Sequence, residues 1–101
     1  SRETLTQHRA DVAFISARAF RIPGGAFEHT YPLVETKRAL ASIAKKVVLL
    51  IDHTKCEHVS LCNSIPLNQI DVIITDNKTP AEILEKAAAL KKEVIVVDPE
   101  E

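Results

Sequence analysis

The sequence predicts an α/β fold in which a mostly parallel sheet is flanked by helices. Short apolar runs alternate with longer segments of helical period along the chain, as they do in βαβ units. Residues 47–51 (VVLLI) show no polar alternation, which is typical of a strand covered on both faces in a parallel sheet. Because the chain has 101 residues, it forms at most one domain.

The first half of the chain predicts a strand, a loop and a helix. Residues 11–16 (DVAFIS) form a short apolar run that suits a buried strand, whereas residues 17–30 contain both glycines and have no regular period, as in a loop. A helix is expected over residues 31–46, with Thr30 as its N-cap and Pro32 in its first turn. Its predicted apolar stripe comprises Leu33, Lys37, Leu40 and Ala44, with Val34 and Ala41 beside it.

The second half continues the alternation. Thr79, Pro80 and Glu82 predict a capping box that opens a helix over residues 80–91. The other expected elements are strands at residues 47–51, 59–62, 70–75 and 94–97 and a turn at residues 66–69.

Composition excludes several classes of protein. Apolar residues make up 46% and charged residues 27%, which is ordinary for a soluble globular domain. The longest apolar run is too short to cross a bilayer, and no secretion signal precedes the two cysteines. We therefore expect a cytoplasmic protein with reduced thiols and no membrane contact. The chain contains no methionine, so we expect it to be part of a longer protein.

The charge distribution argues against nucleic-acid binding by these residues. Residues 1–55 carry nine Lys or Arg against five Asp or Glu, while residues 56–101 carry four against nine. The chain thus has no basic footprint over its whole length and no recognition helix with a basic face. The positive half is either solvated helix surface or a local anion site.

Polar residues that directly follow strands are the main site candidates, because ligands of parallel α/β sheets bind at the carboxyl ends of the strands. In the corner after residues 47–51, Lys55 can place a charge on a phosphate, Thr54 can donate a hydroxyl and Asp52 can accept from sugar hydroxyls. The alternative is an ordinary polar turn in which Asp52 caps the following amides. His53 and Asp76 are secondary candidates in the same region.

Lys37 is a further candidate because it lies on the apolar stripe of its helix. A charged residue there either extends its ammonium to the surface or reaches a ligand. Its neighbour Arg38 is expected to be solvated.

The cysteines and glycines suggest other chemistry only weakly. His53, Cys56, His58 and Cys62 supply four zinc-ligand types, but their spacing fits no usual site, so no metal is expected. Cys56 could have a histidine base nearby, yet no oxyanion loop or third catalytic member is visible. The Gly24–Gly25 pair lacks a phosphate-loop spacing and predicts a turn. No cofactor is expected.

Three blocks of the sequence resemble the latter half of the sensor domain of DeoR-family transcription regulators. They are residues 35–40 (ETKRAL), residues 47–55 (VVLLIDHTK), and residues 65–67 (IPL) together with 70–76 (IDVIITD). The family pattern is similar: a V-K-R-A-M helix, a strand ending in D-S-S-K, and a P-L-x-x-I-D-x-x-I-T-D segment. The resemblance extends over roughly residues 10 to 98.

This resemblance implies a bacterial regulator of sugar metabolism, usually a repressor. Its N-terminal winged helix-turn-helix would bind operator DNA, and its sensor, similar in fold to ribose-5-phosphate isomerase, would bind a phosphorylated sugar or related metabolite. Residues 1–101 would be a partial effector domain without that DNA-binding unit and without the first half of the sensor. By resemblance Lys55 would hold phosphate, Asp52 and Thr54 would shape the site, and Lys37 would face it. We expect a homo-oligomer, since missing layers leave surfaces that pair.

Departures from the pattern and two rival functions stay open. His53 and Thr54 replace the two serines of the corner, Cys56 stands where an aromatic is common, and residues 16–20 lack a glycine, which leaves the effector undefined. A sugar-phosphate isomerase is one rival, but its glutamate base falls at Lys37, which cannot accept a proton while charged. A ligand-free oligomerisation module is the other.

Overall fold

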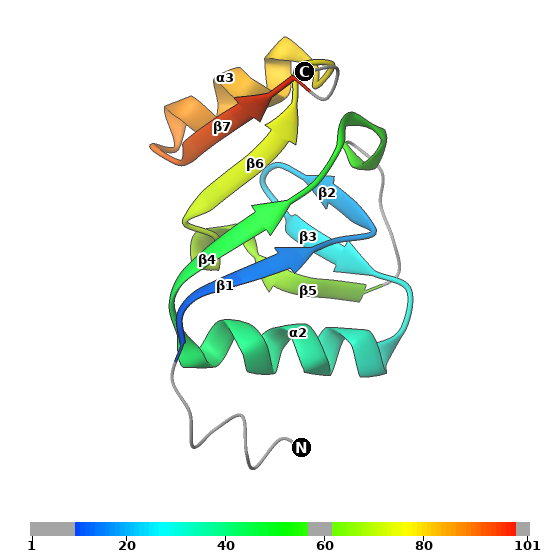
Figure 1. Cartoon of the computed structure of the whole chain (residues 1–101). Helices are drawn as coiled ribbons and strands as arrows, with labels where there is room; N and C mark the ends of the chain where they lie inside the picture. The colour runs from blue at the N-terminus through cyan, green and yellow to red at the C-terminus, as the bar shows by residue number, and fades with distance from the viewer. Residues whose placement is uncertain (1–9, 57–61, 99–101) are drawn as a thin grey trace.

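The main sheet has four parallel strands in the order β1-β4-β6-β7 (Figure 1). The structure is a computed structural model and describes residues 10–56 and 62–98. The predicted α/β class with a parallel sheet and flanking helices is confirmed. The four strands are β1 (Ala10–Ser16), β4 (Ala44–Leu50), β6 (Val72–Asp76) and β7 (Glu93–Val97).

A second, antiparallel sheet of three short strands was not expected. Its order is β2-β3-β5, formed by β2 (Ala19–Arg21), β3 (Gly25–Glu28) and β5 (Cys62–Pro66). The prediction of a loop over residues 17–30 is therefore wrong. Strands of three and four residues are too short to show a period of 2. The strand predicted at residues 59–62 begins at Cys62, and residues 59–61 lie outside the described part.

The predicted turn is found between β2 and β3, where Gly24 ends the turn and Gly25 begins β3. Gly25 adopts a φ of 108°, which side chains with a Cβ rarely tolerate. A Cβ there would also collide with the backbone of Ile65 and Leu67. Glycine at this position thus allows β3 to pair closely with β5.

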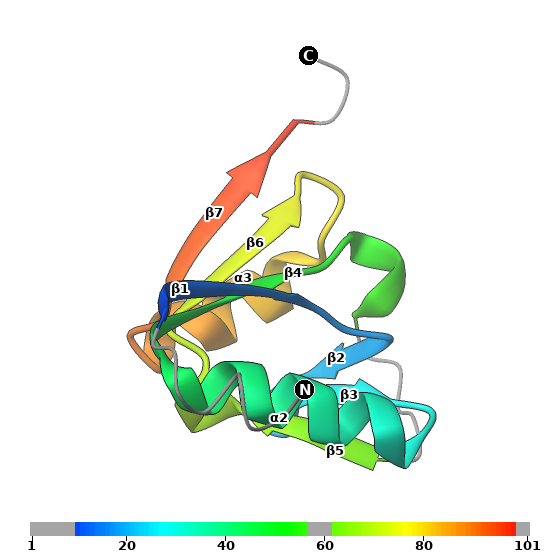
Figure 2. The ribbon, with the colours of Figure 1, turned by 60° about the horizontal axis from the view of Figure 1, so that its bottom comes forward.

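Helix α2 (Tyr31–Ile43) packs against β5 and runs beneath the main sheet (Figure 2). It is shorter than predicted, because β4 begins directly at Ala44. The predicted inner side is confirmed at Val34, which is buried, and at Leu40, Ala41 and Ala44, which pack against the core. Leu33 is exposed, so its place in the predicted stripe is wrong. Thr30 occupies the N-cap but makes no side-chain cap bond.

Arg38 is exposed, as expected, but its guanidinium is also bonded to the backbone of β5. Its Nε donates to the carbonyl of Ser64 at 3.0 Å, and Nη2 donates to that of Asn63 at 2.9 Å. The guanidinium thereby joins α2 to the small sheet, because its planar set of donors can reach two adjacent carbonyls.

Helix α3 (Ala81–Ala89) follows β6 without the predicted capping box. The helix begins after Pro80, and the hydroxyl of Thr79 bonds the hydroxyl of Thr75 at 2.6 Å. Both threonines are buried. The hydrogen bond between these two hydroxyls joins the end of β6 to the start of α3. Thr79 therefore does not cap the helix, although its sequence pattern predicts a cap.

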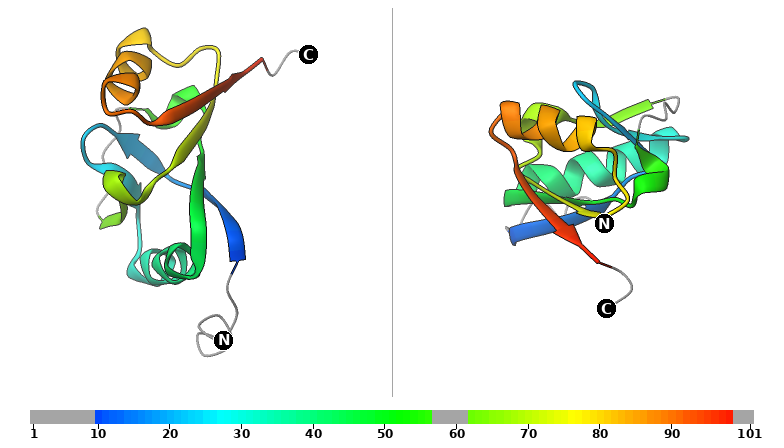
Figure 3. Two further views of the ribbon diagram at one scale, coloured as in Figure 1. Left: turned by 90° about the vertical axis from the view of Figure 1, so that its left-hand side faces the viewer. Right: turned by 90° about the horizontal axis from the view of Figure 1, so that it is seen from above.

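The core lies on one side of the parallel sheet. Both helices and the antiparallel sheet occupy that side in the left view of Figure 3. Buried residues of β1, β4 and β6, such as Ile15, Leu49 and Ile73, face Ile83 and Ala87 of α3 and Phe20 of β2 within one cluster. The cover predicted for both faces of the β4 strand is found at Val47, Val48 and Leu49, whereas Leu50 at the end of the strand is exposed.

Candidate functional site

A cleft of about 420 Å³ opens at the carboxyl ends of the parallel strands. Its polar lining comes from the ends of β1 and β6 and from the corner after β4, namely Ser16, Asp52, Lys55, Thr75 and Asp76. Apolar side chains of Leu50, Ile74 and Val97 complete it. The cleft lies where parallel α/β sheets bind their ligands.

The corner after β4 is a single 3₁₀ turn, η1 (His53–Lys55), capped by Asp52. Asp52 Oδ1 accepts a hydrogen bond from the backbone N–H of Thr54 at 2.8 Å and another from the Thr54 hydroxyl. The Thr54 hydroxyl is the main cause that lowers the pKa of Asp52, so this carboxylate is ionised at neutral pH. Asp52 thus caps the turn and also lines the cleft.

Asp76, at the end of β6, ties this corner to the neighbouring strand. Its Oδ2 accepts from the backbone N–H of His53 at 3.0 Å and lies 2.8 Å from His53 Nδ1, while Oδ1 accepts from the N–H of Lys78 at 2.9 Å. These bonds, that of the His53 side chain first, lower the pKa of Asp76 to about 2. Asp76 lines the cleft, whereas His53 is not among its lining residues.

Lys55 is the cation of the cleft. Its side chain is half-buried and lines the cleft together with the end of β6. Within residues 10–56 and 62–98, no carboxylate forms an ion pair with its ammonium. An ammonium flanked by Asp52 and Asp76 can bind an anionic group that also carries hydroxyls.

Lys37 does not line the cleft but supports one of its walls. Its Nζ lies 2.5 Å from the carbonyl oxygen of Ser16 and 2.5 Å from Oε2 of Glu28. The same Oε2 accepts from the backbone N–H of Arg18 at 3.1 Å. Lys37 and Glu28 therefore hold the end of β1 and the residues that follow it, of which Ser16 and Ala17 line the cleft.

Glu28 is the functional residue that sequence reasoning missed. It ends β3, and its side chain is only 4% exposed. The one signal that could have found it is Lys37 itself, since an ammonium on the inner side of a helix requires an acceptor.

The remaining candidates stand apart from the cleft. Thr54 is exposed and directs its hydroxyl to Asp52. Cys56 is buried in the core, and His58 lies outside the described residues. In the part of the chain that the structure describes, no group of three or more His, Cys, Asp or Glu could hold a metal ion.

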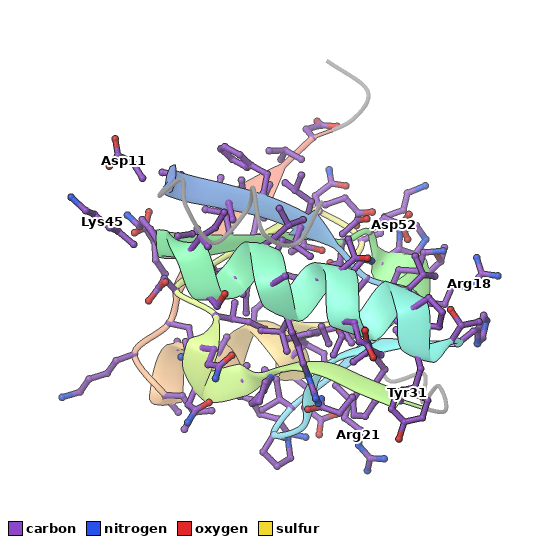
Figure 4. All side chains as sticks on the ribbon, turned by 90° about the horizontal axis from the view of Figure 1, so that it is seen from below. Asp11, Arg18, Arg21, Tyr31, Lys45 and Asp52 are labelled. Carbon is purple, nitrogen blue, oxygen red and sulfur yellow. The ribbon has the colours of Figure 1, made fainter. Side chains whose placement is uncertain are left out.

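The two ends of the sheet differ in character (Figure 4). Asp52 and Arg18 lie toward one end of the molecule, and Asp11 and Lys45 toward the other. Lys45 Nζ is 3.8 Å from Asp11 Oδ1, and both side chains are largely solvent-exposed. A second cleft, of about 560 Å³, lies at the end that carries Lys45 and is lined also by Arg38 and Asp71.

Comparison with known proteins identifies the family of this chain. The model of the DeoR C-terminal sensor domain matches residues 1–77. This chain belongs to the DeoR sensor-domain family. No helix among the described residues of this sensor-domain chain is long and apolar enough to span a membrane.

Curated relatives of this DeoR sensor-domain chain are named as transcription regulators. It is 36% identical over 77 residues to the HTH-type transcriptional regulator GolR of Listeria innocua, covering 76% of this chain and 30% of the relative. A putative aga operon transcriptional repressor of Escherichia coli O157:H7 is 27% identical over 94% of this chain and 35% of its own length. The glycerol-3-phosphate regulon repressor of Escherichia coli K12 is 26% identical over 80% and 32%. The chain thus spans about a third of these relatives.

Proposed function

We propose that this chain senses a phosphorylated sugar or related metabolite within a longer DeoR-type transcription regulator. The observation that carries the proposal is Lys55, a cation without a carboxylate pair among the described residues, in a cleft at the strand ends. The name of one relative, the glycerol-3-phosphate regulon repressor, supports a phosphorylated polyol as the class of effector.

Different residues of the cleft would bind the phosphate and the hydroxyl groups of such an effector. Lys55 binds the phosphate through its charge, and a charge-assisted contact is about twice as strong as a neutral hydrogen bond. Asp52 and Asp76 stay ionised at neutral pH and accept hydrogen bonds from hydroxyl groups. Lys37 acts behind the wall as a positioning residue through Glu28 and Ser16.

The remainder of the regulator is part of the same proposal. A winged helix-turn-helix and the first half of the sensor would precede this chain, and operator DNA would bind that N-terminal unit. The relatives support this division, since they are about three times longer than the matched segment and are named as regulators or repressors. We place such a regulator in the cytoplasm of a bacterium, in control of carbohydrate genes.

An isomerase is the less favoured function. Proton transfer at carbon requires a carboxylate base within reach of the substrate. Glu28 is a buried carboxylate near the segment after β1, but Lys37 and the Arg18 amide occupy its Oε2, and it does not line the cleft. Asp76 is likewise engaged by His53. These bonds favour binding over catalysis.

Titration of the isotope-labelled chain with glycerol 3-phosphate, followed by amide NMR, tests the proposed site. We expect saturable shifts at Ser16, Lys55 and Asp76, with none from glycerol at the same concentrations. Shifts scattered over the surface, or equal shifts with glycerol, would contradict a phosphate site at the strand ends. The Lys45→Ala variant should show the same shifts as the unaltered chain, because Lys45 lies toward the other end of the molecule (Figure 4).

A further inference from the structure

His53 connects the two carboxylates that line the cleft, although it does not line the cleft itself. It follows Asp52 directly and begins the turn η1. Its backbone N–H and its ring atom Nδ1 lie 3.0 Å and 2.8 Å from Oδ2 of Asp76. One residue thus ties the corner after β4 to the end of β6.

The bond to Asp76 fixes which nitrogen of the His53 ring carries a hydrogen. Three hydrogen bonds, that of the His53 side chain first, lower the pKa of Asp76 to about 2, so its carboxylate is ionised at neutral pH and can only accept. Nδ1 is therefore the donor, whether the ring is neutral or charged. The Asp76 side chain is only 11% exposed, so water competes little for this bond.

These bonds leave Asp76 little capacity to accept from a ligand. A carboxylate has about four acceptor positions on its two oxygens. His53 occupies Oδ2 with two bonds, and the amide of Lys78 donates to Oδ1 at 2.9 Å. By the bonds of the described residues, about one position stays open on Oδ1. A hydroxyl group of a ligand in the cleft can donate to it, because Asp76 is part of the cleft lining.

Asp52 is held in a similar manner. Its Oδ1 accepts from both the backbone N–H and the hydroxyl of Thr54, so Oδ2 is the oxygen left to a ligand by the bonds in the described part of the chain. Because His53 adjoins Asp52 and bonds Asp76, it sets where the two carboxylates stand relative to each other and to Lys55.

We propose that His53 is a positioning residue that makes the cleft select phosphorylated compounds with hydroxyl groups over phosphorylated compounds without them. This inference rests on the proposed function. Lys55 would bind the phosphate of both kinds of compound, so the discrimination comes from the carboxylates. A compound without a hydroxyl leaves the open position of the buried Asp76 without a donor, and a site built to bind a hydroxyl rejects such a compound.

The His53 side chain contributes by holding this acceptor in one place. A fixed carboxylate binds a hydroxyl without first losing rotamer freedom, whereas a carboxylate that turns freely loses part of the gain on binding. The family pattern has a serine at this position, so the imidazole is one of the departures of this chain from that pattern.

Titration of the isotope-labelled chain with glycerol 3-phosphate and with propyl phosphate tests the selection. Both ligands have a carbon chain of the same length and one phosphate, but only glycerol 3-phosphate has hydroxyl groups. The unaltered chain should bind glycerol 3-phosphate about tenfold more tightly, which corresponds to one hydrogen bond to a charged group.

Two amide variants separate the place of the donor from the charge of the side chain. The amide nitrogen of His53→Asn stands the same number of bonds from the backbone as Nδ1, so this variant should keep the preference for glycerol 3-phosphate. In His53→Gln the nitrogen takes the place of Nε2, and the preference should fall to about twofold, with propyl phosphate affinity changed less than about twofold. His29→Ala is the matched control, because His29 is exposed and does not line the cleft.

The outcomes distinguish this inference from the proposed function. If neither phosphate binds the unaltered chain, the proposed function fails and the selection by His53 fails with it. If both bind equally, or if His53→Gln keeps the full preference, the phosphate site stands and the role of His53 is refuted. Equal weakening of both ligands in a folded His53→Gln would also refute it, since a purely structural role has that effect.

The ring nitrogens of His53 give a readout that is independent of binding. Their ¹⁵N chemical shifts in the unaltered chain should show a hydrogen on Nδ1, where the bond to Asp76 requires it. A ring with its hydrogen on Nε2 alone would remove the bond on which the proposal depends and would overturn it.

Discussion

Lys37 on α2 and Glu28 on β3 form a nearly buried ion pair, with 2.5 Å between Nζ and Oε2. Through the carbonyl of Ser16 and the amide of Arg18, the pair fixes the segment that leaves β1 and enters the cleft wall. A helix, a strand of the small sheet and the end of a parallel strand therefore meet at this ion pair. This arrangement links the stability of the fold to the shape of the cleft.

Removing one member of this pair should be costly. Lys37→Met leaves Glu28 buried without its counter-charge, so the free energy of unfolding should fall by about 3 kcal/mol. Urea denaturation measures the change. The double variant Lys37→Met with Glu28→Gln removes both charges and should recover part of the loss. A cost for Lys37→Met no greater than that of an exposed lysine would show that the pair contributes little.

Arg38 on α2 and Lys45 at the start of β4 make a second, matched comparison. Arg38→Ala removes two charge-assisted bonds to the carbonyls of β5, and the free energy of unfolding should fall by about 1–2 kcal/mol. Lys45→Ala removes only an exposed pair with Asp11 and should change it by less than about 0.5 kcal/mol. Thermal denaturation of both variants measures these changes. Equal losses of stability would show that the bonds from Arg38 do not hold α2 against β5.

Asp76 predicts how stability depends on pH. Its pKa in the folded chain is about 2, below the ordinary 3.8, because His53 and the backbone bond the ionised form. A lowered carboxyl pKa contributes stability that is fully present above 3.8 and is lost as the pH falls through about 2. The urea midpoint of the unaltered chain should therefore drop across this window, and Asp76→Asn should reduce the drop. Asp52 acts in the same direction, so some drop persists in the variant.

If the pH profiles of Asp76→Asn and the unaltered chain coincide, the bonds from His53 do not stabilise the ionised carboxylate. His53→Ala offers an independent check. It removes the side-chain bond but keeps the backbone N–H donor, so its profile should lie between the other two.

The sequence predicted the parallel sheet and the corner at Asp52 because both depend on local patterns. A five-residue apolar run followed by charged residues indicates a buried strand and its exposed end. Because ligands of parallel sheets bind at the ends of the strands, the end of this strand is enough to predict that Asp52 and Lys55 line the cleft. Asp76 was a candidate for the same reason, although its bond to His53 joins two strands and has no local signal.

Contacts between distant segments explain what the sequence did not predict. The carboxylate that holds Lys37 lies across a turn in a four-residue strand, too short for any period to show. The sequence around Arg38 predicts only a solvated side chain, because the carbonyls that it bonds belong to β5, far along the chain. Thr79 has the pattern of a cap, but the buried hydroxyl of Thr75 provides a nearer partner.

The proposed role of Lys55 in effector binding can be tested in the longer regulator that we propose contains this chain. Lys55→Ala should reduce effector affinity by roughly ten- to a hundredfold, because one charge-assisted contact is worth about 1.5–3 kcal/mol. Operator affinity should stay unchanged, since it belongs to another part of the protein. Folding should also be unaffected, since Lys55 is only half-buried and lies outside the core cluster.

The most direct measurement is release of the regulator from operator DNA across a panel of sugar phosphates, for the unaltered protein and for Lys55→Ala. The account predicts that the unaltered protein responds to one phosphorylated compound and that the variant holds the operator but no longer responds at the same concentration. An equal response of both proteins to the same effector would show that Lys55 is a solvated turn residue and that the cleft does not bind the phosphate.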